Sequence, residues 1–176
     1  WLPRAETGTG FYRWELDAYQ MKAIRSVPDD RWKALRIEVK PWAKGGRHIV
    51  VAMPTQPYSA LHGTERWTDQ TVELLNKLTD RPIVIRSKES KTPLWDDLKG
   101  AHALVTHGSN AANEAVILGC PVFVDKSCAA SLVGKTDLNE IERPAYPDRE
   151  PWLHSLAYSQ FSEAELLDGT LWRLIA

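Results

Sequence analysis

The segment from Ala103 to Val124 constrains the fold more than any other part of the chain. It opens with a short apolar run over 103–106 and closes with another over 121–124, the pattern of strands that are buried on both faces. Between them, a His-Gly turn precedes small and apolar residues at helical spacing, and a glycine follows them. The segment therefore predicts a strand, a helix and a second strand.

Strands and helices also alternate before this segment. A buried strand is predicted over 48–53 and a further strand over 83–85, with an amphipathic helix over 65–78 and a short helix over 93–99. This alternation is typical of right-handed βαβ units that share one parallel sheet. We therefore expect an α/β fold: a Rossmann-like three-layer domain with a parallel sheet of four to five strands.

Flanking regions surround the predicted core, which spans residues 47–143. Residues 1–46 read as a small N-terminal appendage, and residues 144–176 as a helical tail packed on the core, with a C-terminal helix that crosses it. Within the appendage we expect a loop over 7–10, a weak helix over 13–25 and an edge strand over 35–39.

Two helices are expected in the tail. One is predicted over 152–160, and the second begins at Ser162 and runs to about Leu174. Ser162 is followed three residues later by Glu165, which is the signature of a capping box.

Charge and composition exclude several kinds of protein. The 22 basic and 23 acidic residues nearly cancel, so a general nucleic-acid or membrane-surface binder is not indicated. No signal peptide is visible and no apolar run approaches the ~20 residues of a membrane span, so a cytoplasmic location is expected. Cys120 and Cys128 lack the spacing of a metal motif and read as reduced structural thiols. Walker A, Gly-x-Ser-x-Gly and Asp-x-Asp patterns are all missing from the sequence.

Ser-x-x-x-x-Glu-Ala followed by Gly-x-Pro-Val, within 109–123, resembles the donor-binding, C-terminal half of GT-B glycosyltransferases and of related sugar-nucleotide epimerases. The resemblance covers about His48 to Asp125. The tail pattern Pro-Asp-Arg-Glu-Pro-Trp-Leu-His, over 147–154, is similar to phage-encoded proteins of glycosyltransferase type. A phage origin implies that the protein works in the host cytoplasm.

The resemblance implies a donor site. Gly108, Ser109 and Asn110 would contact the donor phosphates, and Glu114 would hold the ribose hydroxyls. The donor would be a UDP-, GDP- or CMP-linked sugar, and no metal ion or other cofactor is required. The alternative is a purely structural role, in which the helix packs on the sheet and binds no ligand.

Further candidate residues lie at predicted strand ends, which open into the ligand crevice of such folds. Arg86 and Lys88 follow the strand over 83–85 and can neutralise a diphosphate, unless they belong to a solvated loop. His107 precedes the glycine turn, and His62 lies in the predicted loop 54–63. These two histidines are the catalytic candidates, as acid or base, against the alternative of structural or surface histidines.

The chain departs from the family pattern because it holds one Rossmann-like domain instead of two. Three explanations are open: the half that binds the acceptor is missing from this sequence, a partner or a second copy of the chain supplies it, or the protein is a reduced member of the family. A glycan or a modified nucleobase both fit as acceptor. Two alternative functions remain: a non-catalytic nucleotide-binding or interaction module, and a sugar-nucleotide epimerase.

Overall fold

The computed structural model describes residues 11–175. The chain divides into two compact units: residues 38–147 form one, and residues 1–37 together with 148–176 form the other. We call them the parallel-sheet unit and the terminal unit. The sequence predicted a core of residues 47–143, which is shorter than the observed unit of residues 38–147. Each unit is described by itself below.

The parallel-sheet unit confirms the predicted fold class. Its four strands run parallel in the order β3-β2-β4-β5, and they are β2 (His48–Ala52), β3 (Ile83–Arg86), β4 (Ala101–Thr106) and β5 (Val122–Val124). Ile49 lies between Ile83 and Ala103, and Leu104 pairs with Val122. Beyond β5, Lys135 forms a single parallel bridge with Phe123.

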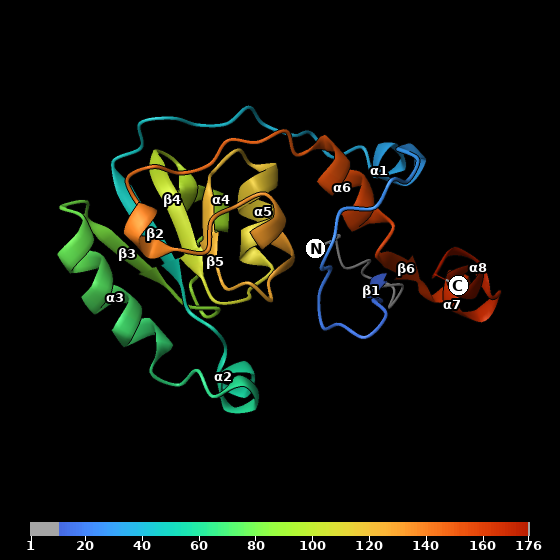
Figure 1. Cartoon of the computed structure of the whole chain (residues 1–176), viewed down its shortest axis with the longest axis horizontal. Helices are drawn as coiled ribbons and strands as arrows, with labels where there is room; N and C mark the ends of the chain where they lie inside the picture. The colour runs from blue at the N-terminus through green and yellow to red at the C-terminus, as the bar shows by residue number, and fades with distance from the viewer. Residues whose placement is uncertain (1–10, 176) are drawn as a thin grey trace. The chain divides into compact units, whose positions relative to one another are not determined.

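Helices cover both faces of this sheet (Figure 1). The face that carries α3 (Trp67–Leu78) lies opposite the face that carries α4 (Leu94–Leu98) and α5 (Ala111–Ile117). A further helix, α2 (Gln56–His62), follows β2, and two short 3₁₀ helices, η1 (Ala129–Leu132) and η2 (Leu138–Glu140), follow β5. The arrangement has three layers.

The core follows from the alternation of side chains along buried strands. Odd-numbered residues of the strands pack with Leu75 of α3 and with Ile141; they are Ile49, Val51, Ala103, Val105 and Phe123. The even-numbered neighbours Val50 and Leu104 point to the opposite face of the sheet, by the alternation of strand side chains, and are also fully buried. Strands buried on both faces explain why the sequence shows continuous apolar runs.

The strand order creates a topological switch point in the sheet. From β2 the chain moves to its neighbour β3 on one side, and then crosses to β4 on the other side of β2. The order reverses between β2 and β4, and ligands of open α/β sheets bind outside the carboxyl ends of the strands at such a switch point.

Two local predictions, one in this unit and one at its border with the terminal unit, were wrong. The predicted loop 54–63 contains α2, because Pro57 lies in the first turn, where proline is tolerated, and Gly63 ends the helix with φ +64°. Residues 35–39 form no strand. Their burial does alternate, but Arg36 has φ 52° and interrupts the extended backbone.

The terminal unit pairs β1 (Phe11–Arg13) with β6 (Gln160–Ser162) in an antiparallel ribbon. Its helices are α1 (Asp30–Ala34), α6 (Glu150–Ala157), α7 (Glu163–Leu167) and α8 (Thr170–Ile175). The capping box of Ser162 and Glu165 is confirmed. The helix expected over 152–160 ends at Ala157, and the one expected from Ser162 breaks at Gly169, which has φ +80°.

Two further predictions concern the N-terminal residues. Residues 14–25 are not helical, so the weak helix over 13–25 was wrong, and Asp17 has φ 50° there. The predicted loop 7–10 lies outside the described residues.

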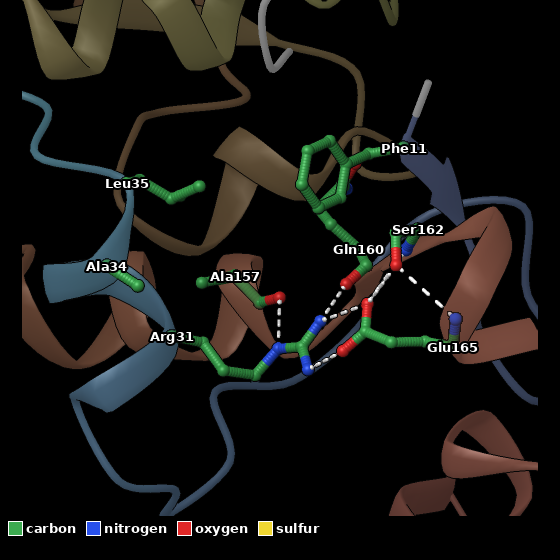
Figure 2. Close-up of a pocket in the computed structure, with 8 residues that line it drawn as sticks. All are labelled: Phe11, Arg31, Ala34, Leu35, Ala157, Gln160, Ser162 and Glu165. Carbon is green, nitrogen blue, oxygen red and sulfur yellow. Dashed lines mark hydrogen bonds and ion pairs between the residues drawn. The ribbon is translucent and has the colours of Figure 1, made fainter. Parts of the chain in front are cut away.

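Arg31 ties the elements of the terminal unit together (Figure 2). Its guanidinium donates to both carboxylate oxygens of Glu165 and to the carbonyl oxygens of Gln160, at 2.5 Å, and Ala157, at 3.3 Å. The Arg31 side chain also lies over the ring of Phe161, 5.0 Å from its centroid. Arg31 therefore joins α1 to α6, β6 and α7.

We expect Glu165→Gln to lower the free energy of unfolding by about 1–2 kcal/mol at pH 7. The hydrogen bond from Arg31 lowers the pKa of Glu165, against partial burial, which raises it. The stabilisation is therefore complete above the unfolded-state pKa, about 4.3, and disappears as the pH falls through the folded-state pKa. Urea denaturation between pH 3 and pH 7 should show the two proteins converging in acid. A constant difference at all pH values would contradict the prediction.

Candidate functional site

The carboxyl ends of β2 and β4 bring together residues from two distant parts of the sequence. His107 follows β4, and its Nδ1 lies 3.0 Å from the hydroxyl oxygen of Tyr58, on α2. Close by, the hydroxyl of Thr106 donates to the carbonyl oxygen of Ala52 at 2.8 Å. The hydrogen bond between Tyr58 and His107 thus spans the switch point of the sheet.

Aromatic rings surround His107. The ring centroid of His62, the last residue of α2, lies 4.1 Å from that of Tyr58 and 6.5 Å from that of His107. Trp67, the first residue of α3, meets His107 edge to face at 6.0 Å. We call Tyr58, His62, Trp67 and His107 the switch-point cluster. It contains both histidines that the sequence named as catalytic candidates.

A cavity of about 530 Å³ opens beside α2, in the size range of small-molecule sites. It lies between the segment after β2, the start of α3 and the segment after β3. Its lining residues are Met53, Pro54, Thr55, Gln56, Ser59, Glu65, Thr68, Asp69, Ser87, Lys88 and Glu89. Three carboxylates and one ammonium group give this cavity a net negative charge, and hydroxyl and amide groups supply most of its other polar atoms.

A smaller cavity of about 110 Å³ lies at the ends of β4 and β5. Trp67, Thr106, Asp125 and Thr136 contribute to its lining. Desolvation raises the pKa of Asp125, but hydrogen bonds from Ser127 and the attraction of His107 outweigh it, so the pKa is lowered. Trp67 belongs to both this lining and the switch-point cluster, so the small cavity adjoins His107.

The two predicted cations differ in their surroundings. Arg86 forms a partly buried ion pair with Asp97 of α4 and donates to the carbonyl oxygen of Thr92 at 2.6 Å. Its charge is therefore already balanced within the protein. Lys88 lines the larger cavity, where it faces an acidic lining.

The turn after His107 has the predicted form. Gly108 is buried, Ser109 is partly buried and Asn110 is exposed at the N-cap position of α5. The Ser109 hydroxyl oxygen accepts a hydrogen bond from the backbone N–H of Ala111 at 3.2 Å. This bond leaves the hydroxyl proton of Ser109 available to donate to a ligand.

Glu114 occupies the first turn of α5 and is partly buried. Burial raises its pKa, and the attraction of Arg86 opposes this rise. A carboxylate that is held where burial disfavours its charge is a common feature of functional sites.

Sequence reasoning missed Asp97, which neutralises Arg86, and the acidic residues Glu65 and Asp69 of the larger cavity. The signal for Glu65 and Asp69 was present, because a helix that follows a strand begins at the carboxyl edge of the sheet. For Asp97 no such signal exists, since the ion pair depends on how α4 packs.

Other kinds of site receive no support within residues 11–175. That part of the chain has no cluster of three or more His, Cys, Asp or Glu side chains suited to a metal ion. It also has no helix that is both long and apolar enough to cross a membrane. Cys120 and Cys128 are free and buried, and burial raises the pKa of Cys120 to about 12.

A third cavity, of about 340 Å³, lies in the terminal unit and is shown in Figure 2. Among the described residues that line it, Arg31 is the one cation, and Glu165 already pairs with it. The polar groups that suit small-molecule chemistry gather instead at the sheet edge of the parallel-sheet unit.

Comparisons with models of protein families, with curated proteins and with solved structures found no match to this chain.

Proposed function

We propose that the parallel-sheet unit binds a sugar nucleotide at the carboxyl ends of β2 and β4 and transfers its sugar to an acceptor. One observation carries the proposal: a hydrogen bond joins Tyr58 to His107 across the switch point, and Gln56 and Ser59 of the same helix α2 line a ligand-sized cavity. Ser109 follows His107 by two residues. The resemblance of residues 109–123 to GT-B donor sites adds to it. The protein would act as a metal-independent glycosyltransferase.

The charges suggest how such a donor lies. Lys88 alone does not offset the carboxylates of the larger cavity, so the diphosphate belongs near Ser109 and His107, where a hydroxyl and an imidazole can donate. Hydroxyl-rich sugars suit the larger cavity, because carboxylates and hydroxyls there accept and donate hydrogen bonds. Glu114 would accept hydrogen bonds from the ribose hydroxyls.

Arg86 has a smaller role in this proposal than the sequence suggested. Because it pairs with Asp97, it contributes charge at a distance and not a free bidentate fork. The reaction itself would form a bond between the acceptor oxygen and the anomeric carbon as the bond from that carbon to the diphosphate breaks. The acceptor proton passes to a base, and hydrogen-bond donors stabilise the charge on the diphosphate.

The first test is a thermal-shift panel of UDP-, GDP- and CMP-linked sugars. We expect one nucleotide class to raise the melting temperature, because a ligand at 100 times its Kd adds about 2.7 kcal/mol to the stability. No shift with any member of the panel would rule out donor binding. Product analysis without an acceptor then separates epimerisation and hydrolysis from transfer.

Glu114→Gln provides a sharper test. We expect the variant to bind the identified nucleotide about tenfold more weakly, because an uncharged amide replaces a carboxylate acceptor. Since burial raises the pKa of Glu114, its charged form costs stability in the folded state above the unfolded-state pKa. The variant should therefore be at least as stable as the parent at pH 7, and this gain should vanish in acid.

Glu73→Gln is the matched control, because Glu73 is an exposed glutamate on α3. It should change neither affinity nor stability measurably. Unfolding of Glu114→Gln would instead identify Glu114 as a structural residue, and unchanged affinity would remove it from the ribose site.

A further inference from the structure

His107 is held by groups that come from several elements. Tyr58 and His62 of α2 and Trp67 of α3 present their rings to it, and the Asp125 carboxylate after β5 attracts it. Within the described residues, the His107 ring makes its hydrogen bond through Nδ1, which lies 3.0 Å from the Tyr58 hydroxyl oxygen. The rings of Tyr58 and His107 lie 5.7 Å apart at 64°.

The chemistry of this pair decides where the proton lies. A neutral imidazole nitrogen is a stronger base than a phenol oxygen, so the Tyr58 hydroxyl donates to Nδ1. The neutral ring then carries its own proton on Nε2, because the hydrogen bond at one nitrogen sets the state of the other.

We propose that Tyr58 is a positioning residue that orients the His107 ring and fixes its Nε2–H form, so that His107 serves the site as a hydrogen-bond donor. The use of this donor toward an oxygen of the ligand rests on the proposed function; the orientation and the tautomer do not. His107 is then not the base for the acceptor, as the sequence allowed, and His62 remains the candidate for that role.

Protonation of the ring preserves the donor. When the ring carries both protons, Nδ1–H donates to the Tyr58 oxygen and Nε2 keeps its hydrogen. The donor at Nε2 is therefore present in both charge states, and only the loss of Tyr58 lets the neutral ring exchange its proton between the two nitrogens. His62 is the other titratable group on α2 that faces the ring.

Nitrogen-15 NMR of the histidine rings tests the proposal without any ligand. For the neutral ring of His107 in the parent, we expect Nδ1 to be unprotonated and Nε2 to be protonated. In Tyr58→Phe both nitrogens should move toward values averaged between the tautomers. Tyr158→Phe, which removes a hydroxyl that donates to Asp30 at 2.8 Å in the terminal unit, should leave His107 unchanged. Protonated Nδ1 in the parent, or no change in Tyr58→Phe, would overturn the proposal.

A double-mutant cycle tests the functional consequence, with UDP, GDP and CMP as probes. For the nucleotide that binds, Tyr58→Phe should weaken binding about threefold to tenfold in the parent, and less than about twofold when His107 is already Gln. Equal losses in both backgrounds would show that Tyr58 does not act through His107. If the NMR result holds but no nucleotide binds, the proposed function fails and the positioning of His107 stands.

Discussion

Gly119→Ala should destabilise the protein by about 3–5 kcal/mol, one of the two largest effects that we expect. A Cβ atom at this position would lie 2.1 Å from the carbonyl oxygen of Pro41, where the backbone has no room to accept it. The same residue has φ +80°, which already costs an L side chain about 1–2 kcal/mol. Chemical denaturation of the two proteins measures the difference.

The close approach of Pro41 to Gly119 also explains how Gly119→Ala would lower the free energy of unfolding. The segment 40–43 lies against the end of α5 through backbone hydrogen bonds from Lys40 N to Ile117 O, at 2.9 Å, and from Ala43 N to Gly119 O, at 2.8 Å. Pushing Pro41 away breaks this contact, so the conformational cost and the packing cost add together.

Gly100→Ala is the matched control for this prediction. Gly100 also follows a helix, α4, and has φ +70°, but an added Cβ would meet no atom within 4 Å. We expect a loss of about 1–2 kcal/mol, from the backbone conformation alone. Equal losses for Gly119→Ala and Gly100→Ala would show that the close approach of Pro41 has no energetic weight.

Phe123→Ala should cost about 3–5 kcal/mol, the second large effect. Phe123 lies on β5 at 1% exposure, within the cluster that includes Val105, Leu75 and Ile141. Truncation removes the buried ring and leaves a cavity that a parallel sheet packed on α3 cannot close easily. The measurement is the free energy of unfolding in urea.

Two comparisons sharpen the prediction for Phe123. Phe123→Leu retains most of the apolar volume and should cost less than about 1.5 kcal/mol. Leu61→Ala, at a position of 76% exposure on α2, should stay within about 0.5 kcal/mol. A small loss for Phe123→Ala would mean that the cluster around β5 is not the core that stabilises this unit.

The parallel-sheet unit was the part of the fold that the sequence predicted best. Strands β2, β4 and β5 appear as apolar runs because both of their faces are buried, and glycines with positive φ follow α2, α4 and α5. The helix α2 escaped prediction because proline, serine and histidine are also typical of loops. Residues 35–39 show the opposite error, since alternating burial there reflects packing without strand pairing.

For the candidate site, sequence reasoning predicted members but not their partners. It named His62, His107, Lys88 and Glu114, and the structure brings the two histidines together. It could not show that Asp97 neutralises Arg86 or that acidic side chains line the larger cavity. Such pairings depend on the angle and depth at which helices pack, which no local pattern records.

The sequence by itself determined that this chain builds a parallel α/β core, because the burial of strands and the endings of helices are local properties of residue type and spacing. Only the tertiary structure decided that Tyr58 meets His107, two residues separated by 49 positions, and that residues 1–37 join 148–176 in a second unit. The physical reason is that such long-range contacts depend on how the whole sheet positions its elements. The spacing of residues along the chain does not encode that placement to the accuracy that a hydrogen bond of 3.0 Å requires.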